Sequence, residues 1–246
     1  MLFTEEPLSI QVHPDDAFAQ SIGLAHGKTE AWYILSALPG AKVAVGLKRQ
    51  LTAPQLRASI EDGSILDLVQ WRGVLKGDVV FVPAGTIHAI GPGLVIAEIQ
   101  QRSDATFRLF DHGRQRELHV DNAVAAATAG PALGRSAPRP LTSTRTLLIA
   151  SPQFVLERID LPPESIWQLR AECEAWILIL DGQVRVGFMK AFVGEAIFLE
   201  ADCTRIKAGP KGLTGLVAYM GPAPIPGLLH KLDGQVDGIP VRTRET

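Results

Sequence analysis

The 246-residue chain lacks the features that mark a membrane-spanning, secreted or nucleic-acid-binding protein. It has no run of about 18 apolar residues, the length that a membrane-spanning helix needs. Its first residues carry neither a basic region nor a long apolar core, so we predict no signal peptide. Its 24 basic and 26 acidic residues leave a net charge of −2, which indicates neither nucleic-acid binding nor a disordered tail.

Cysteine and histidine are also scarce. Cys173 and Cys203 lie far apart and form no CxxC motif. They could form a disulfide, but we expect two reduced thiols in a cytoplasmic protein. The second half of the chain has no histidine before His230, so the histidines that could bind a metal lie in the first half.

The segment Leu8-Ser-Ile-Gln-Val-His-Pro-Asp-Asp16 is the most informative part of the chain. Its first residues are typical of a β-strand, in which side chains two residues apart share a face. Gln11 and His13 therefore point the same way, and Pro14 ends the strand because it has no N–H to donate. The alternative is a strand with a polar face that carries a histidine by chance.

A second polar pair, Lys28 and Glu30, opens a run rich in aromatic and β-branched residues. A carboxylate in such a strand is costly to bury without a partner, which could be a metal ion or Lys28. The alternative is an ion pair exposed to water at the strand edge, worth little.

A third segment, residues 77–90, has a strand–turn–strand pattern with His88 just after a Pro-Ala-Gly turn. This pattern resembles the second motif of the cupin barrel, in which an inward histidine is a metal ligand. Together, Gln11, His13, Glu30 and His88 form a mixed nitrogen and oxygen set. Such a set suits Zn²⁺ with an open position, and it could also hold non-haem Fe(II) or Mn²⁺.

These segments, with residues 97–101 and 103–114, resemble the type I mannose-6-phosphate isomerases (phosphomannose isomerases) of the short bacterial form. The resemblance implies a zinc-dependent aldose–ketose isomerase of carbohydrate metabolism that interconverts mannose 6-phosphate and fructose 6-phosphate. It places the zinc ligands on Gln11, His13, Glu30 and His88. It also places catalytic residues on Arg108 and Lys28, and substrate-binding residues on Asp104 and Arg114.

The reaction explains these residue types. A proton moves between C1 and C2 of the open-chain sugar through an enediolate, whose negative charge needs preorganised cations. Zinc can act as a Lewis acid on the substrate oxygens. Arg108 can stabilise the anion, but its guanidinium stays protonated and is no general base. The base could be Lys28, a carboxylate, a histidine or zinc-bound hydroxide.

Other interpretations stay open. Arg102, Arg108, Arg114 and Arg116 could together form a solvated basic face. The chain could also be a catalytically weak or silent module that binds sugar phosphates, or a metal-dependent cupin enzyme of other chemistry, such as an Fe(II) dioxygenase. In each case we expect a small-molecule partner, and neither a nucleic acid nor a membrane.

The pattern of strands and turns predicts an all-β protein with a few short helices, arranged as two cupin-type, jelly-roll-like β-barrels. We expect a metal-binding catalytic barrel in residues 1–127, a linker in 128–144, and a second, metal-free barrel with a C-terminal tail in 145–246. Helices are expected at 52–61, with Thr52 as N-cap, and at 64–69 and 117–127. Asp181-Gly182 predicts a hairpin turn, and the tail from Gly221 should be loosely held.

Relatives usually carry several dozen residues before the Gln11 segment, whereas here Met1 stands close to it. We therefore expect residues 1–10 to form an edge or near-edge strand beside an open barrel. Apolar side chains exposed there would favour homo-oligomers and weak isomerase activity.

Overall fold

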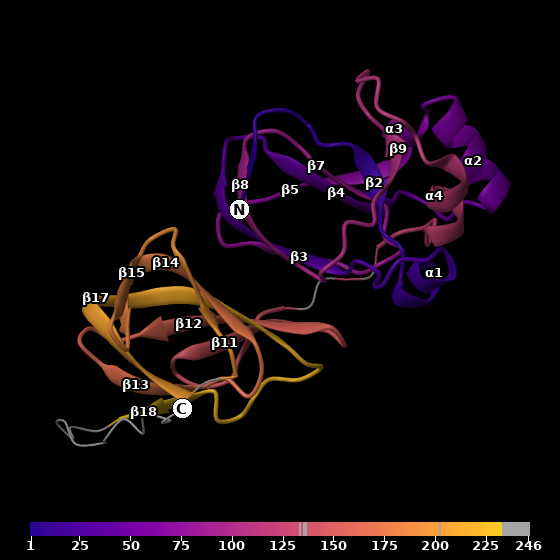
Figure 1. The fold of residues 1–246 in the computed structure, drawn as a ribbon. Helices are drawn as coiled ribbons and strands as arrows, with labels where there is room; N and C mark the ends of the chain where they lie inside the picture. Colours follow the sequence, from indigo (N-terminus) through magenta and orange to yellow (C-terminus); the bar gives the residue numbers. More distant parts are fainter. Residues whose placement is uncertain (133, 135–136, 202, 233–246) are drawn as a thin grey trace. The chain divides into compact units, whose positions relative to one another are not determined.

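Antiparallel strands dominate both halves of the computed structural model, which describes residues 1–132, 134, 137–201 and 203–232 (Figure 1). The chain divides into two units, residues 1–137 and residues 138–246, and each has its own hydrophobic core. The predicted fold class, all-β with a few short helices, is confirmed. Closure of the sheets into barrels stays a prediction.

Unit 1 contains two sheets, and their strand orders are β1-β8-β3-β6 and β5-β4-β7-β2-β9. The strands of the first sheet are β1 (Leu2–Thr4), β3 (Glu30–Ala37), β6 (Val79–Val82) and β8 (Leu94–Gln100). The strands of the second sheet are β2 (Ile10–Val12), β4 (Lys42–Leu47), β5 (Val69–Gly73), β7 (His88–Ile90) and β9 (Phe107–Phe110). As expected for the first residues, β1 lies at a sheet edge, with β8 as its partner, and Phe3 is exposed.

Side chains on opposite faces of these strands pack into two different apolar clusters. Trp32 and Ile34 of β3 pack in one cluster with Val43 and Val45 of β4, so this core lies between the two sheets. Ala44, from the opposite face of β4, belongs to the other cluster, together with side chains from the helices. One face of the second sheet is therefore covered by helices, and the other faces the first sheet.

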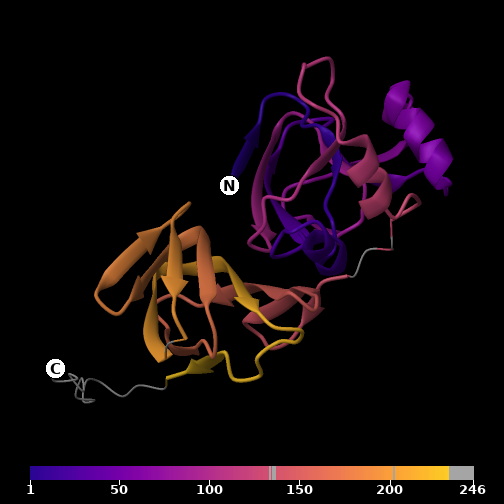
Figure 2. The same cartoon turned by 45° about the vertical axis from the view of Figure 1, so that its right-hand side comes forward.

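The helices gather at one end of unit 1 (Figures 1 and 2). They are α1 (Asp16–Ser21), α2 (Ala53–Glu61), α3 (Ile65–Leu68) and α4 (Val120–Ala126). The predicted N-cap of α2 is confirmed, because Thr52 Oγ1 accepts from the Gln55 N–H and Gln55 Oε1 accepts from the Thr52 N–H. None of the helices that the structure describes is long and apolar enough to cross a lipid bilayer.

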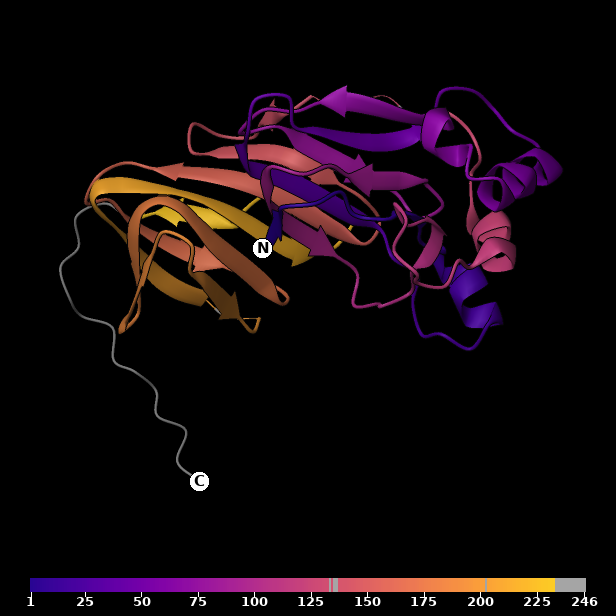
Figure 3. The same cartoon turned by 90° about the horizontal axis from the view of Figure 1, so that it is seen from above.

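Unit 2 is built around the long strand β17, which pairs with β12, β13 and β14 (Figure 3). Its strands are β10 (Arg139–Pro140), β11 (Arg145–Ala150), β12 (Phe154–Leu161), β13 (Ile166–Arg170), β14 (Ala175–Val186), β15 (Met189–Phe192), β16 (Ala196–Leu199), β17 (Cys203–Met220) and β18 (Leu229–Lys231). Alternate residues point into one apolar cluster, as Ile177 and Ile179 of β14 do. Cys173 and Cys203 form no disulfide in the structure, and their reduced state stays a prediction.

The hairpin predicted at Asp181-Gly182 is wrong, because β14 continues through both residues. Its register against β17 shifts on either side of them, so they form a β-bulge. Gly182 supplies the positive φ of 76° that the bulge needs, and the turn itself comes later, between Val186 and Met189.

The predicted linker and the tail that was expected to be loosely held both form backbone hydrogen bonds with the strands of their units. In the segment predicted as a linker, the Gly130 and Ala129 carbonyls accept from the N–H groups of Leu47 and Leu51, at 2.9 and 2.8 Å. In the predicted tail, β18 pairs with β13. Residues 233–246 of that tail lie outside the described residues.

Candidate metal centre

The two sheets of unit 1 direct polar side chains into the core between them. Gln11 of β2 is the register partner of His88 on β7 and of Arg108 on β9. Side chains directly opposite each other in antiparallel strands share a face, so these three lie on one side of the second sheet. On the first sheet, Trp32 of β3 is the register partner of Glu98 on β8.

Two histidines and one carboxylate meet in this core. His13 Nε2 lies 3.4 Å from Glu30 Oε2, and His88 Nε2 lies 3.3 Å from Glu30 Oε1. One ligand atom from each of these residues falls within 4.8 Å of the others. Gln11 Nε2 lies 3.2 Å from His88 Nε2, so all four residues predicted as ligands come together.

The backbone fixes how both imidazoles point. His13 Nδ1 lies 2.7 Å from the Ala105 carbonyl, and His88 Nδ1 lies 2.9 Å from the Thr86 carbonyl. A carbonyl oxygen can only accept, so each Nδ1 carries a proton, and in the neutral form of either ring the lone pair is on Nε2. Histidines that ligate metals commonly donate their other N–H in this way.

Two atoms of the group have no hydrogen-bond partner although both are buried, namely His13 Nε2 and Glu30 Oε2. Leaving a buried polar atom unpaired costs about 1–3 kcal/mol. When His13 is neutral, its Nε2 lone pair faces the Glu30 carboxylate across 3.4 Å, which is unfavourable unless a cation lies between them. The residues present therefore fit a divalent metal ion, and a mixed imidazole and carboxylate set suits zinc.

Burial and charge set the pKa values in this cluster. Burial opposes ionisation of Glu30, but His88, His13 and Lys28 outweigh it and bring its pKa down to about 2. Burial lowers the pKa of His88 to about 4, against the opposing pull of Glu30. At neutral pH Glu30 is therefore an anion and His88 is neutral, which are the states in which a carboxylate and an imidazole can bind a metal.

Glu98 is a carboxyl group of this site that was not among the predicted site residues. The Trp32 indole N–H donates to Glu98 Oε1 at 3.2 Å, and burial, with the nearby Glu30 charge, raises the pKa of Glu98 to about 7. Glu98 lies in the matched segment 97–101, so the resemblance was a signal that could have pointed to it. Its position opposite Trp32 depends on strand register, which the sequence does not show.

Lys28 contacts one of the four predicted ligands, and Arg108 lies opposite another, Gln11, in the sheet register. Lys28 Nζ is 3.5 Å from Glu30 Oε2, and their side chains are only 12% and 1% exposed. The alternative of an ion pair open to water is therefore wrong. Arg108 is half-buried, and its Nη1 donates to the Glu117 carbonyl at 2.8 Å.

The two predicted substrate-binding residues lie outside this cluster. Asp104 is exposed in the loop between β8 and β9. Arg114 donates to Asp111 at 3.1 Å and to the Pro7 carbonyl at 2.9 Å, and it lies 3.6 Å from Glu6. Arg116 binds the same Asp111, so these two arginines form a local ion cluster.

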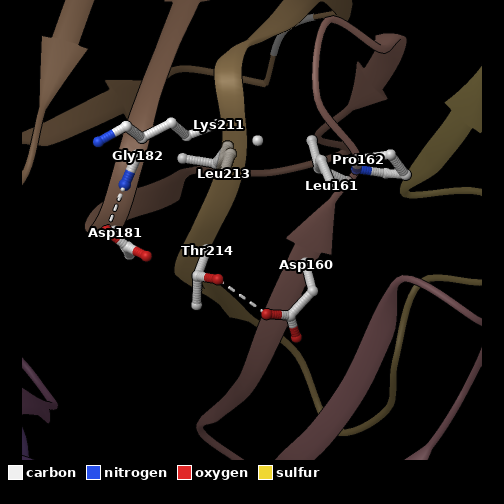
Figure 4. Close-up of a pocket in the computed structure, with 9 residues that line it drawn as sticks. Asp160, Leu161, Pro162, Asp181, Gly182, Lys211, Leu213 and Thr214 are labelled. Atoms are coloured by element: carbon white, nitrogen blue, oxygen red, sulfur yellow. Dashed lines mark hydrogen bonds between the residues drawn. The ribbon is translucent and has the colours of Figure 1, made fainter.

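A separate hollow lies in unit 2, beside the bulge of β14 (Figure 4). Its acidic side chains already have internal partners. Asp160 accepts from Thr214 at 2.9 Å, and Asp181 accepts from the Gly182 N–H at 2.9 Å. We assign it no ligand.

Comparisons with known proteins point to one group of enzymes, although no family model matches the chain. The mannose-6-phosphate isomerase of Streptococcus mutans is 40% identical over 187 residues, which are 73% of this chain and 58% of that protein. The mannose-6-phosphate isomerase ManA of Bacillus subtilis is 38% identical over 131 residues, which are 50% of this chain and 41% of that protein.

A comparison with solved structures points to the same group of enzymes. The crystal structure of the mannose 6-phosphate isomerase from Bacillus subtilis matches with a TM-score of 0.75 and 27% identity, over 87% of this chain and 72% of that chain. The chain thus spans 58% and 41% of the lengths of the two curated relatives above. The predicted resemblance is confirmed: in sequence and in fold, the chain is similar to mannose-6-phosphate isomerases.

Proposed function

We propose that the chain is a zinc-dependent aldose–ketose isomerase that interconverts mannose 6-phosphate and fructose 6-phosphate. The observation that carries the proposal is the buried His13–Glu30–His88 group, in which two facing atoms, His13 Nε2 and Glu30 Oε2, have no hydrogen-bond partner. Homology to enzymes named for this reaction supports the choice of substrate. A cytoplasmic location and assembly into homo-oligomers stay predictions.

His13, Glu30 and His88 would hold the metal, with Gln11 as the fourth ligand. The Gln11 amide now places its nitrogen toward His88 and its oxygen toward Ser9. Rotation of the amide by half a turn would present the oxygen instead. When bound, the zinc ion would supply Lewis-acid polarisation of the substrate oxygens.

The chain's own residues supply charge and a proton acceptor. Arg108 shares a sheet face with Gln11 and His88, and we assign it the stabilisation of the enediolate charge. Lys28 adds a second positive charge beside Glu30. For the base that moves the proton between C1 and C2 we propose Glu98, because it is a carboxyl group beside the cluster and outside the ligand set.

The substrate phosphate also needs cations. Arg114 and Asp104 stay proposals for substrate binding on the strength of the resemblance alone. In the structure Arg114 is paired with Asp111, so binding a phosphate would require it to exchange that partner.

A coupled assay that detects fructose 6-phosphate formed from mannose 6-phosphate tests the proposal. We expect turnover by the zinc-loaded chain, its loss in His88→Ala, and its retention in His230→Ala, a histidine of unit 2. If the wild-type chain binds zinc and the sugar phosphate but gives no turnover, the isomerase proposal is wrong and the chain is a binding module.

A further inference from the structure

The Trp32 side chain contacts both carboxyl groups of the site, Glu30 and Glu98, through a single donor. Its indole N–H lies 3.2 Å from Glu30 Oε1 and 3.2 Å from Glu98 Oε1. An indole has one N–H and no acceptor, so the two carboxyl groups share this donor. Trp32 is fully buried.

The same side chain also packs against a metal ligand. The Trp32 ring meets the His88 imidazole edge to face, with centroids 5.6 Å apart and planes at 66°. His88 therefore has a carbonyl partner on one side and an aromatic wall on another, so the ring is restrained in both position and tautomer.

The hydrogen bond from Trp32 to Oε1 determines which oxygen of Glu30 has no hydrogen-bond partner. With Oε1 bonded to the indole, Oε2 is the oxygen that faces His13 and Lys28 without a hydrogen-bond partner. A rotation of the carboxyl group would break the indole bond. Trp32 thus holds the free oxygen in the place where a cation between Glu30 and His13 would meet it.

We propose that Trp32 is a positioning residue of the metal centre, which orients Glu30 for ligation and holds Glu98 beside it through one shared N–H. This inference rests on the proposed metal site but not on the isomerase reaction. Residues that orient ligands from outside the coordination sphere commonly contribute ten- to a hundredfold to metal affinity, and a merely space-filling ring would contribute nothing of this kind.

Trp32→Phe tests the proposal, because it keeps an aromatic ring and removes the N–H. The matched control is Trp167→Phe in unit 2, where a buried indole donates to Ser165 Oγ at 2.8 Å. Each protein is titrated with Co²⁺, and both the affinity and the visible spectrum of the bound ion are recorded. We expect Trp32→Phe to bind Co²⁺ roughly ten- to a hundredfold more weakly and with an altered spectrum, and Trp167→Phe to match the wild type.

If Trp32→Phe does not fold, Trp32 is replaced by benzothienylalanine, which has the shape of tryptophan with sulfur in place of the N–H. Wild-type Co²⁺ affinity and spectrum in Trp32→Phe, or in the benzothienylalanine variant, would overturn the inference. Failure of the wild type to bind Co²⁺ would also overturn it, together with the metal site. A wild-type chain that binds Co²⁺ but gives no turnover would disprove only the isomerase proposal, and the comparison of variants would still decide the role of Trp32.

Discussion

Arg108 is the residue whose proposed role a single substitution tests most directly. It shares a sheet face with Gln11 but is outside the ligand set, so Arg108→Ala should leave zinc content intact. Loss of a preorganised charge should lower kcat by roughly 100-fold or more. The coupled assay measures kcat and atomic absorption measures zinc, with Arg170→Ala of unit 2 as control. Turnover at the wild-type rate would remove Arg108 from the mechanism.

Asp111 gives a prediction for acid stability. A hydrogen bond from Arg116, with help from Arg114 and against burial, lowers its pKa to about 2. The ionised carboxylate therefore stabilises the fold above its ordinary pKa of 3.8, and this stability is lost as the pH falls toward 2.

Asp111→Asn should lower the free energy of unfolding at pH 6 by about 1 kcal/mol, a modest figure because both guanidinium partners are partly exposed to solvent. The difference between variant and wild type should shrink between pH 4 and pH 2, as measured by urea unfolding. A difference that stays constant over this range would show that the ion cluster contributes nothing.

At the scale of single residues, the sequence predicts the proposed metal ligands better than it predicts the residues that orient them. The spacing of Gln11 and His13, and the resemblance at Glu30 and His88, predicted four side chains that the structure brings together. The contact between Trp32 and Glu98 depends on the register of β3 against β8. The position of the Arg114 side chain depends on a local partner, Asp111. Such pairings are long-range or conformational, so neither composition nor spacing predicts them.

The bulge in β14 leads to a prediction at the scale of one element. A Cβ on Gly182 would lie 2.2 Å from the Gly212 carbonyl oxygen, whereas one on Gly194 would meet nothing within 4 Å. Both glycines have positive φ, at 76° and 88°. Gly194→Ala should cost roughly 1–2 kcal/mol from backbone strain alone. Gly182→Ala should cost more, by about 1–3 kcal/mol, because of the added clash.

Urea unfolding of both variants checks this prediction. Equal losses of stability would mean that the backbone relaxes at the bulge and that the close approach to Gly212 is unimportant. The same residue shows why Asp181-Gly182 was predicted as a turn: a positive φ at glycine is common to hairpins and bulges, and only the partner strand β17 distinguishes them.

A buried ion pair ties several elements of unit 2 together. Arg145 of β11 donates to both oxygens of Glu157 of β12, at 2.8 and 2.7 Å, and also to the carbonyls of Ile225 and Pro226. Tyr219 of β17 donates to the same carboxylate. Glu157→Ala leaves the buried Arg145 without a counter-charge and should cost about 3–5 kcal/mol. Tyr219→Phe should cost about 1 kcal/mol.

Denaturant unfolding followed by tryptophan fluorescence measures both losses. If Glu157→Ala proves no more costly than Tyr219→Phe, water or a neighbouring group replaces the carboxylate and the network is not a strong restraint. Neither result should affect metal binding, because all four proposed ligands lie in unit 1.

The whole molecule has two units with separate cores, and the proposed metal ligands belong to one of them. A ligand that binds only the native state raises the stability of the part that it binds, by RT ln(1 + [L]/Kd). Because the two cores are separate, calorimetry of the full chain should show two unfolding transitions. Zinc at about 100 times its Kd should add about 2.7 kcal/mol to the unit 1 transition alone.

Two variants assign the transitions. Gly182→Ala should lower only the transition of unit 2, and His88→Ala should abolish the zinc response without removing either transition. A chelator should reverse the effect of zinc on the wild-type chain. If zinc shifts both transitions equally, or if only one transition is seen, the units unfold as one cooperative body and the stability of unit 2 is coupled to the metal.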